Sequence, residues 1–135
     1  MPVLAGRRSV RWLIGCAGFL ALANLASDRV VHAQARRDFT VTANHYEFIV
    51  AGNDKHEIRV NLGDVVRITF DAQDIPHSFT TQEPARHYRI DRRAEPGKPV
   101  TFEFRADQEG TIPILCTLTM EARCKEMHAT LIVTK

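Results

Sequence analysis

The chain has 135 residues, of which 44% are apolar and 25% are charged, and its formal net charge is +2. This length is enough for one domain and excludes a large multidomain enzyme. The charge is unevenly distributed, because residues 1–35 carry four arginines and one aspartate, which leaves 14 basic and 15 acidic side chains in residues 36–135. A slightly acidic folded part does not provide the basic surface of a nucleic-acid-binding domain. No nucleic-acid partner is therefore expected.

The first 35 residues have the three parts of a secretory signal peptide: a basic start, an uncharged apolar run and small residues at a cleavage site. These parts are Arg7, Arg8 and Arg11, then Trp12–Ser27, then Val31–Ala35. The sequence therefore predicts export to the periplasm or another compartment outside the cytoplasm, with cleavage near Ala33 or Ala35. The apolar run is shorter than the ~18–20 residues that span a bilayer. An uncleaved anchor is the alternative, and only then would the protein contact a membrane.

The remaining residues, 36–135, are expected to form one all-β domain. Apolar and polar residues alternate in short segments separated by turn signals, and no stretch has a sustained helical period. Seven or eight such strands indicate a single antiparallel Greek-key β-sandwich or barrel. The nine candidate segments from which these strands are expected are, in chain order, Phe39–Ala43, Tyr46–Val50, Glu57–Val60, Val65–Phe70, His77–Thr81, the short Tyr88–Ile90, Val100–Phe104, Thr111–Cys116 and Ala129–Thr134.

Sulfur-containing side chains are concentrated near the end of the chain. Because Cys16 lies in the leader, the mature chain keeps only Cys116 and Cys124, and outside the cytosol such a pair suggests a disulfide. Two of the three methionines, Met120 and Met127, lie in the same segment. Sulfur ligands combined with imidazole suit copper, and His77, after a proline at the start of an earlier strand, is the best histidine candidate.

Several segments together resemble the cupredoxins, especially the periplasmic copper domains of cytochrome c oxidase subunit II and nitrous oxide reductase. They are Asn61–Phe70, Asp74–Phe79, Pro96–Phe104 and Ala106–Thr111, the last leading to Cys116. Their order and spacing carry the resemblance, which covers most of residues 38–135. It implies a Greek-key sandwich that binds copper.

The ligand loop departs from this family in one of two registers. Dinuclear members carry Cys-x3-Cys-x3-His-x2-Met, and a register without gaps puts Cys116, Met120, Cys124 and Met127 in those four places. A rival register pairs Cys124 and His128 with the second cysteine and the histidine, but it needs four inserted residues. We prefer the gapless register because it preserves the spacing and the final strand.

Neither register supplies the full ligand set of a dinuclear centre. The resemblance therefore implies one copper ion, Cu(I) or Cu(II), held by His77, Cys116, Cys124 and Met127, with Met120 and His128 in reserve. Two thiolates and one imidazole favour Cu(I) more than an ordinary blue site does, and Zn(II) would compete. The other histidines, His45, His56 and His87, are interpreted as surface residues.

These observations predict an exported copper-binding protein that transfers electrons or carries copper and has no catalytic activity of its own. Its expected partner is a redox protein or a copper-accepting protein, and it is expected to be a monomer. One alternative is a metal-free β-sandwich interaction module locked by a Cys116–Cys124 disulfide. Another is an accessory subunit-II-like domain of a respiratory oxidase or reductase. The two cysteines cannot hold a metal and each other at the same time, because a disulfide sulfur lacks the thiolate charge.

Overall fold

The structure is a computed structural model, and it describes residues 34–82 and 87–135. The predicted leader lies outside the described residues except for Gln34 and Ala35. Export of the protein and cleavage of the leader therefore stay predictions. The first strand, β1, begins at Arg36, where the mature chain was predicted to begin. Within the described ranges, no helix has the length and apolar character needed to cross a membrane.

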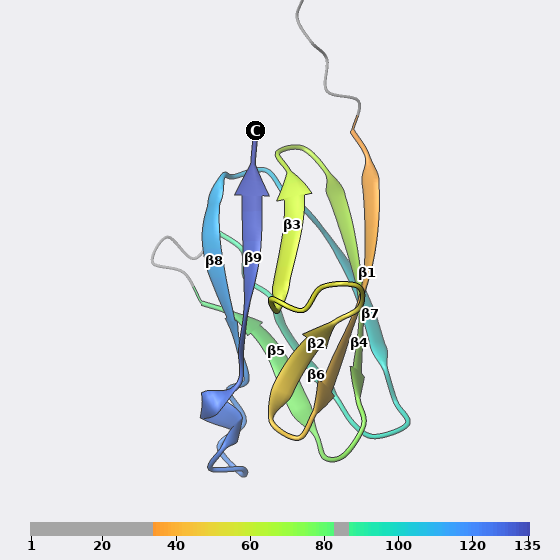
Figure 1. Cartoon of the computed structure of the whole chain (residues 1–135), viewed down its shortest axis with the longest axis vertical. Helices are drawn as coiled ribbons and strands as arrows, with labels where there is room; N and C mark the ends of the chain where they lie inside the picture. The colour runs from red at the N-terminus through yellow and green to blue at the C-terminus, as the bar shows by residue number, and fades with distance from the viewer. Residues whose placement is uncertain (1–33, 83–86) are drawn as a thin grey trace, which may run out of the picture. The chain divides into compact units, whose positions relative to one another are not determined.

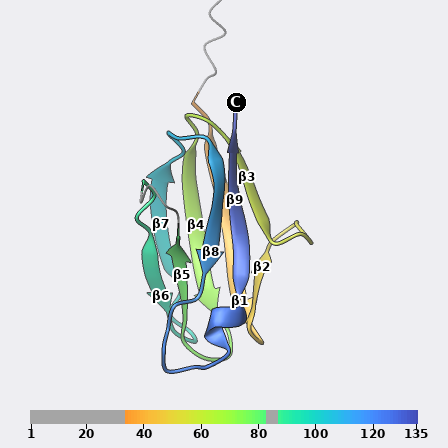
Figure 2. The same ribbon diagram turned by 90° about the vertical axis from the view of Figure 1, so that its left-hand side faces the viewer.

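Nine strands in residues 34–82 and 87–135 form two sheets, which confirms the predicted all-β sandwich (Figure 1). The first sheet has the order β2 (Glu47–Val50), β1 (Arg36–Asn44), β4 (Val65–Ala72) and β7 (Val100–Arg105). The second has the order β3 (Glu57–Asn61), β9 (His128–Thr134), β8 (Gly110–Leu115), β5 (His77–Thr81) and β6 (Asp91–Ala94). Figure 2 shows the layering, with β8 and β9 in front of β4 and β1.

The sheets are mixed, whereas the sequence predicted antiparallel pairing. β1 is parallel to β4, and β3 is parallel to β9, while the other pairs are antiparallel. Alternation identifies the side chains that point inward, but the pattern is the same whichever way the neighbouring strand runs. Strand direction depends on long connections that cross between the sheets, and these leave no local signal.

The strand predicted at Tyr88–Ile90 is not present at those residues. The strand in this region is β6, which begins at Asp91, the residue after Ile90. Tyr88 and Ile90 are buried and contribute to the core, as their apolar character suggested. The first three residues of β6 are exposed at the edge of the sheet. The apolar pattern of the sequence therefore predicted the buried side chains of this region correctly but placed the strand wrongly.

Four phenylalanines join the two sheets at the centre of the core. Phe79 on β5 packs against rings from the opposite sheet, with centroid distances of 6.3 Å to Phe48, 5.8 Å to Phe70 and 5.3 Å to Phe102. Tilted and edge-on contacts of this kind add to the free energy gained by removing the rings from water. Phe79 lies two residues after His77, so this cluster also fixes the strand that presents the histidine.

Strand pairing brings the candidate ligands to one end of the sandwich. β5 begins at His77, β8 ends just before Cys116, and β9 begins just after Met127. β8 lies between β5 and β9 and is antiparallel to both: its last residue, Leu115, is opposite His128 of β9 and Thr80 of β5. The chain that follows Leu115 therefore runs toward the start of β5, where the Ser78 N–H meets Sγ of Cys116. The loop between β8 and β9 includes a short 3-10 helix, η1 (Cys124–Glu126), and lies at the lower end in Figure 1.

Candidate metal centre

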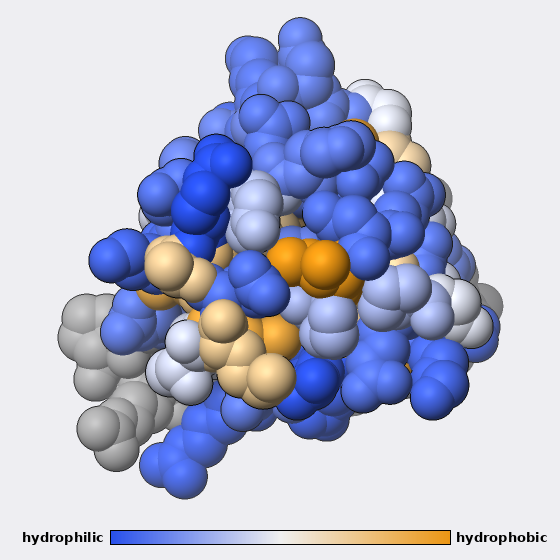
Figure 3. All heavy atoms as spheres, turned by 90° about the horizontal axis from the view of Figure 1, so that it is seen from below, coloured by the Kyte–Doolittle hydropathy of each residue, from blue (hydrophilic) through white to orange (hydrophobic). Residues whose placement is uncertain are grey.

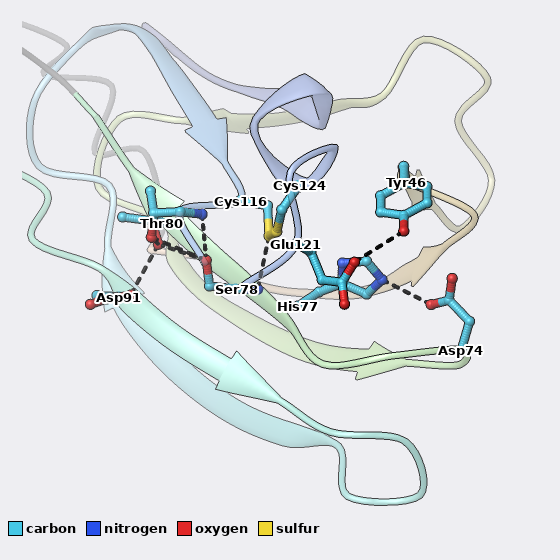
Figure 4. Close-up of a disulfide and its surroundings, with 10 residues drawn as sticks. Tyr46, Asp74, His77, Ser78, Thr80, Asp91, Cys116, Glu121 and Cys124 are labelled. Atoms are coloured by element: carbon cyan, nitrogen blue, oxygen red, sulfur yellow. Dashed lines mark hydrogen bonds and ion pairs between the residues drawn. A yellow bond between two sulfur atoms is a disulfide. The ribbon is translucent and has the colours of Figure 1, made fainter. Parts of the chain in front are cut away.

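Three of the four predicted ligands lie together in the interior. The ligand atoms of His77, Cys116 and Cys124 are all within 4.8 Å of one another, and each residue is at most 2% exposed. The two cysteines are joined as a disulfide, with their Cα atoms 5.2 Å apart (Figure 4). Pro76 lies immediately before His77 and suits the start of a strand, because its backbone nitrogen carries no hydrogen to donate to a neighbouring strand. The cluster therefore combines a preformed cysteine pair with one imidazole.

His77 is oriented by Asp74, a residue three positions earlier in the turn that precedes β5. The Nε2 atom of His77 lies 2.8 Å from Oδ1 of Asp74. An ionised carboxylate only accepts hydrogen bonds, so Nε2 carries the proton and the neutral ring leaves the Nδ1 lone pair free. Nδ1 is buried and has no hydrogen-bond partner. A buried nitrogen without a partner is costly, and a metal ion beside the sulfur atoms would satisfy it.

The carboxylate of Asp74 is held in its charged form. Burial alone would raise the pKa of Asp74, but hydrogen bonds from the Ile75 backbone and from His77 outweigh burial, and the pKa lies below its ordinary value. The other oxygen, Oδ2, accepts a hydrogen bond of 2.9 Å from the backbone N–H of His45. Asp74 thus connects His77 to the β1–β2 turn. The sequence resemblance included this residue but predicted no role for it.

Cys116 is fixed from the other side by β5. The backbone N–H of Ser78 donates to Sγ of Cys116 at 3.4 Å, and the backbone N–H of Thr117 donates to Oγ of Ser78 at 2.8 Å. The hydroxyl of Thr80 continues this network, because it lies 3.1 Å from the Thr117 hydroxyl and donates to Asp91 at 3.0 Å (Figure 4). A hydrogen bond to sulfur stabilises the thiolate form that binds metals.

Tyr46, in the β1–β2 turn, contacts both the histidine and the ligand loop. Its ring lies edge-on to His77, with centroids 6.2 Å apart, and its hydroxyl donates to Oε2 of Glu121 at 3.3 Å. The guanidinium of Arg123 lies 4.5 Å from the centre of the same ring. Burial, followed by the charge of Glu121, raises the pKa of Tyr46. No local pattern identified Tyr46, because it lies 31 positions before His77 and joins the centre only through folding.

Known proteins match this chain in structure, although no protein-family model and no curated protein matches it in sequence. A chain of a heme-copper terminal oxidase dimer aligns with a TM-score of 0.65 and 19% identity over 77% of this chain and 67% of that one. The periplasmic domain of subunit II of the cytochrome oxidase of Bradyrhizobium japonicum gives 0.58 and 18% over 73% and 84%. Auracyanin A, a "blue" copper protein of Chloroflexus aurantiacus, gives 0.55 and 19% over 73% and 99%.

The chain has the cupredoxin fold. This agrees with the resemblance deduced from the sequence. At identities near 19% the likeness establishes the fold alone and assigns no ligands to this domain.

The remaining ligand candidates occupy different environments in the domain. Met127 is 1% exposed and directly precedes β9, which fits either a core residue or a weak axial ligand. Met120 is 82% exposed, so its sulfur is not part of the buried cluster. His128 is exposed, and its Nδ1 lies 3.1 Å from the Glu126 carbonyl oxygen. The structure thus assembles His77 and the cysteine pair and places both reserve residues outside them.

The end of the domain that carries the ligand loop exposes a group of apolar side chains among hydrophilic ones (Figure 3). A groove of about 280 Å³ opens beside the loop, and its lining includes Cys116, Leu118 and Ala122. Lys125 and Glu121 add one charge of each sign to this lining. Cys116 is buried, but it also lines this groove, so the cysteine pair lies next to a groove that is open to solvent.

Proposed function

We propose that this domain binds one copper ion through His77, Cys116, Cys124 and Met127. The observation that carries the proposal is the buried His77 ring, which has an unpartnered Nδ1 atom and a ring nitrogen within 4.8 Å of both cysteine sulfurs. Asp74 holds the other ring nitrogen, the arrangement by which protein-bound histidines present a lone pair to a metal. Imidazole, thiolate and thioether are together the donor set that suits copper.

The donor set favours copper carriage over electron transfer. Two thiolates and a thioether stabilise Cu(I), whereas rapid electron exchange needs a site that accommodates both oxidation states. The exported location predicted from the leader agrees with the structural likeness to a periplasmic domain. A copper-accepting protein in the same compartment is the expected partner, and a redox protein is the partner if the site cycles between oxidation states.

Copper binding requires the disulfide to open. Two electrons and two protons convert it to two thiols, and the thiols lose their protons when they bind the ion. A thioredoxin-like dithiol protein can supply these electrons and protons while its own cysteines form a disulfide. One structurally similar protein, subunit II of a cytochrome c oxidase, is known as a mixed-disulfide intermediate with a thioredoxin-like protein. The groove beside Cys116 offers such a reductant a place to dock.

A metal-free interaction module is the second candidate function, and the Cys116–Cys124 disulfide favours it. In that case the bridge serves stability, and a bridge across a separation of 8 residues is worth roughly 2–3 kcal/mol. The two candidates make opposite predictions for reduced protein.

Titration with Cu(I) under anaerobic conditions separates the two functions. We expect the reduced protein to take up one Cu(I) per chain, and the oxidised protein to take up none at this site, as measured by competition with a coloured Cu(I) chelator. A colourless, tight complex supports carriage, whereas a strong thiolate-to-copper absorption band after oxidation supports electron transfer. Failure of the reduced protein to compete for Cu(I) would refute the copper site and leave the interaction module.

Removal of the Asp74 carboxylate should weaken copper binding without preventing folding. In Asp74→Ala, His77 loses the acceptor that sets its tautomer and orientation, and Cu(I) affinity should fall about 10–100-fold. Asp74→Asn is the matched variant, because its amide oxygen still accepts from Nε2 and should restore most of the affinity. An equal loss in both variants, or no loss in Asp74→Ala, would contradict this positioning role.

A further inference from the structure

The two cysteines of the candidate centre are held by different parts of the fold. Cys116 directly follows β8, and β5 holds it there, because the Ser78 N–H donates to its sulfur and Oγ of Ser78 accepts the Thr117 N–H. Neither bond involves Cys124, so neither requires the disulfide. Cys124 lies 8 residues further along the chain, in η1, and belongs to neither sheet. Its position therefore depends on the contacts of the ligand loop.

Tyr46 contacts the ligand loop shortly before Cys124. Its hydroxyl donates to Oε2 of Glu121 at 3.3 Å, which is the dashed line between the two residues in Figure 4. The backbone carbonyl oxygen of Glu121 in turn accepts a hydrogen bond from the Cys124 N–H at 3.0 Å. A single residue, Glu121, therefore connects the tyrosine to the backbone of the cysteine.

The same ring also contacts the residue directly before Cys124. The guanidinium of Arg123 lies 4.5 Å from the ring centre of Tyr46, and a cation over an aromatic face is attracted by the π electrons. Nε of Arg123 donates to Oε2 of Glu126 at 3.2 Å, which orients the guanidinium. The ring is edge-on to His77 as well, with centroids 6.2 Å apart. Tyr46 thus joins the segment that carries Cys124 to the histidine of the centre.

We propose that Tyr46 is the positioning residue for Cys124 in the dithiol form, because it keeps the ligand loop closed over His77 after the disulfide has opened. The inference rests on the proposed function, in which the dithiol form is the one that binds copper. The disulfide and Tyr46 hold the same loop conformation, so each strengthens the other. Without the tyrosine, opening of the disulfide leaves Cys116 held by β5 and allows Cys124 to move away.

A loop that stays closed favours copper binding and slows copper release. A preorganised site binds its ligand more tightly, because less conformational entropy is lost when the complex forms. If the ligand atoms of Cys116, Cys124 and His77 keep their closeness in the dithiol form, the ion meets three donors already in place. Tyr46 thus regulates how readily the site passes copper to an accepting protein.

The test measures the accessibility of each thiol and needs no copper. The full-length chain is reduced, and labelling of Cys116 and Cys124 by iodoacetamide is followed separately by mass spectrometry. A buried thiol reacts only when the structure around it opens. Tyr46→Asn is the informative variant, because asparagine lacks the ring and tolerates the left-handed backbone of Tyr46 (φ 64°). Tyr46→Phe keeps the ring and removes only the hydroxyl.

We expect Tyr46→Asn to raise the labelling rate of Cys124 about tenfold and that of Cys116 less than about twofold. Tyr46→Phe should raise the Cys124 rate by a smaller factor, about threefold. Tyr88→Phe is the matched control and should change neither rate, because the Tyr88 hydroxyl bonds the backbone of Gln108, between β7 and β8. An unchanged Cys124 rate in Tyr46→Asn would overturn the proposal, as would an equal rise at both cysteines, which would mean that the whole domain is loosened. If Tyr46→Asn does not fold, as judged by circular dichroism, Tyr46→Phe decides by the same criterion.

A separate measurement with copper distinguishes this result from that of the copper site. The Cu(I) affinity of reduced Tyr46→Asn should fall about tenfold relative to the unaltered chain in a chelator competition. An unaltered chain that binds no Cu(I) but is labelled as expected would refute the copper site and support the role of Tyr46 in holding Cys124. Equal Cu(I) affinity in the variant and the unaltered chain would overturn the effect of Tyr46 on copper.

Discussion

Replacement of Cys116 with serine is expected to abolish Cu(I) binding by the reduced protein. Cys116 follows β8 directly, and its sulfur lies within 4.8 Å of a ring nitrogen of His77 and accepts a hydrogen bond from the Ser78 N–H. A serine hydroxyl is a poor ligand for Cu(I) and leaves only one thiolate in the cluster. Since loss of a partner outside the ligand set already costs 10–100-fold in affinity, loss of the thiolate should cost more than about 100-fold. Chelator competition measures this directly.

Met120→Leu is the matched control for this prediction. Met120 lies in the same loop and carries sulfur, but it is 82% exposed, so its replacement should leave Cu(I) affinity unchanged. Cys124→Ser should behave like Cys116→Ser. Full Cu(I) binding by either serine variant would refute the proposed site, and a large loss in Met120→Leu would show that the reserve residue Met120 is itself a copper ligand.

Replacement of Phe79 with alanine is expected to cause a large loss of stability, about 3–5 kcal/mol in the free energy of unfolding. Phe79 is 1% exposed and is the residue of β5 that contacts three aromatic rings of the opposite sheet. Its truncation leaves a cavity between the sheets that the neighbouring rings cannot fill without moving. Urea unfolding of the oxidised protein, followed by circular dichroism, measures the change.

Two further variants make this prediction decisive. Phe79→Leu keeps much of the buried volume and should cost less than the alanine variant, which matters if Phe79→Ala does not fold. Ile49→Ala is the matched surface control, because Ile49 is 44% exposed on β2 and its truncation should change the free energy by no more than about 0.5 kcal/mol. A loss below about 1 kcal/mol in Phe79→Ala would mean that the aromatic cluster does not hold the sheets together.

The local features of the fold were predictable because they depend on short stretches of sequence. Inward and outward side chains alternate along β1, β4 and β9 as the pattern predicted, since successive residues of a strand face opposite sides. Strand direction was not predictable. The parallel pairing of β1 with β4 and of β3 with β9 depends on contacts between residues far apart in the chain.

The candidate site was predictable only in its ligand types. Sulfur chemistry and the family resemblance selected His77, Cys116 and Cys124, and folding brings these three together. The residues that position them were missed. Tyr46 and Asp74 have no distinctive spacing, and they act through an edge-on ring contact and a single hydrogen bond.

The sequence by itself determined an all-β domain, a short list of copper ligands and a choice between disulfide and metal for the two cysteines. The fold class and the choice for the cysteines depend on composition, alternation and spacing, which are local properties, and the list of ligands depends also on the family resemblance. Only the tertiary structure decided that Met120 and His128 lie outside the buried cluster, and that Nδ1 of His77 is free while Nε2 is engaged. The physical reason is that burial and hydrogen-bond partners are set by which strands meet, and β5, β8 and β9 meet only in the folded sandwich.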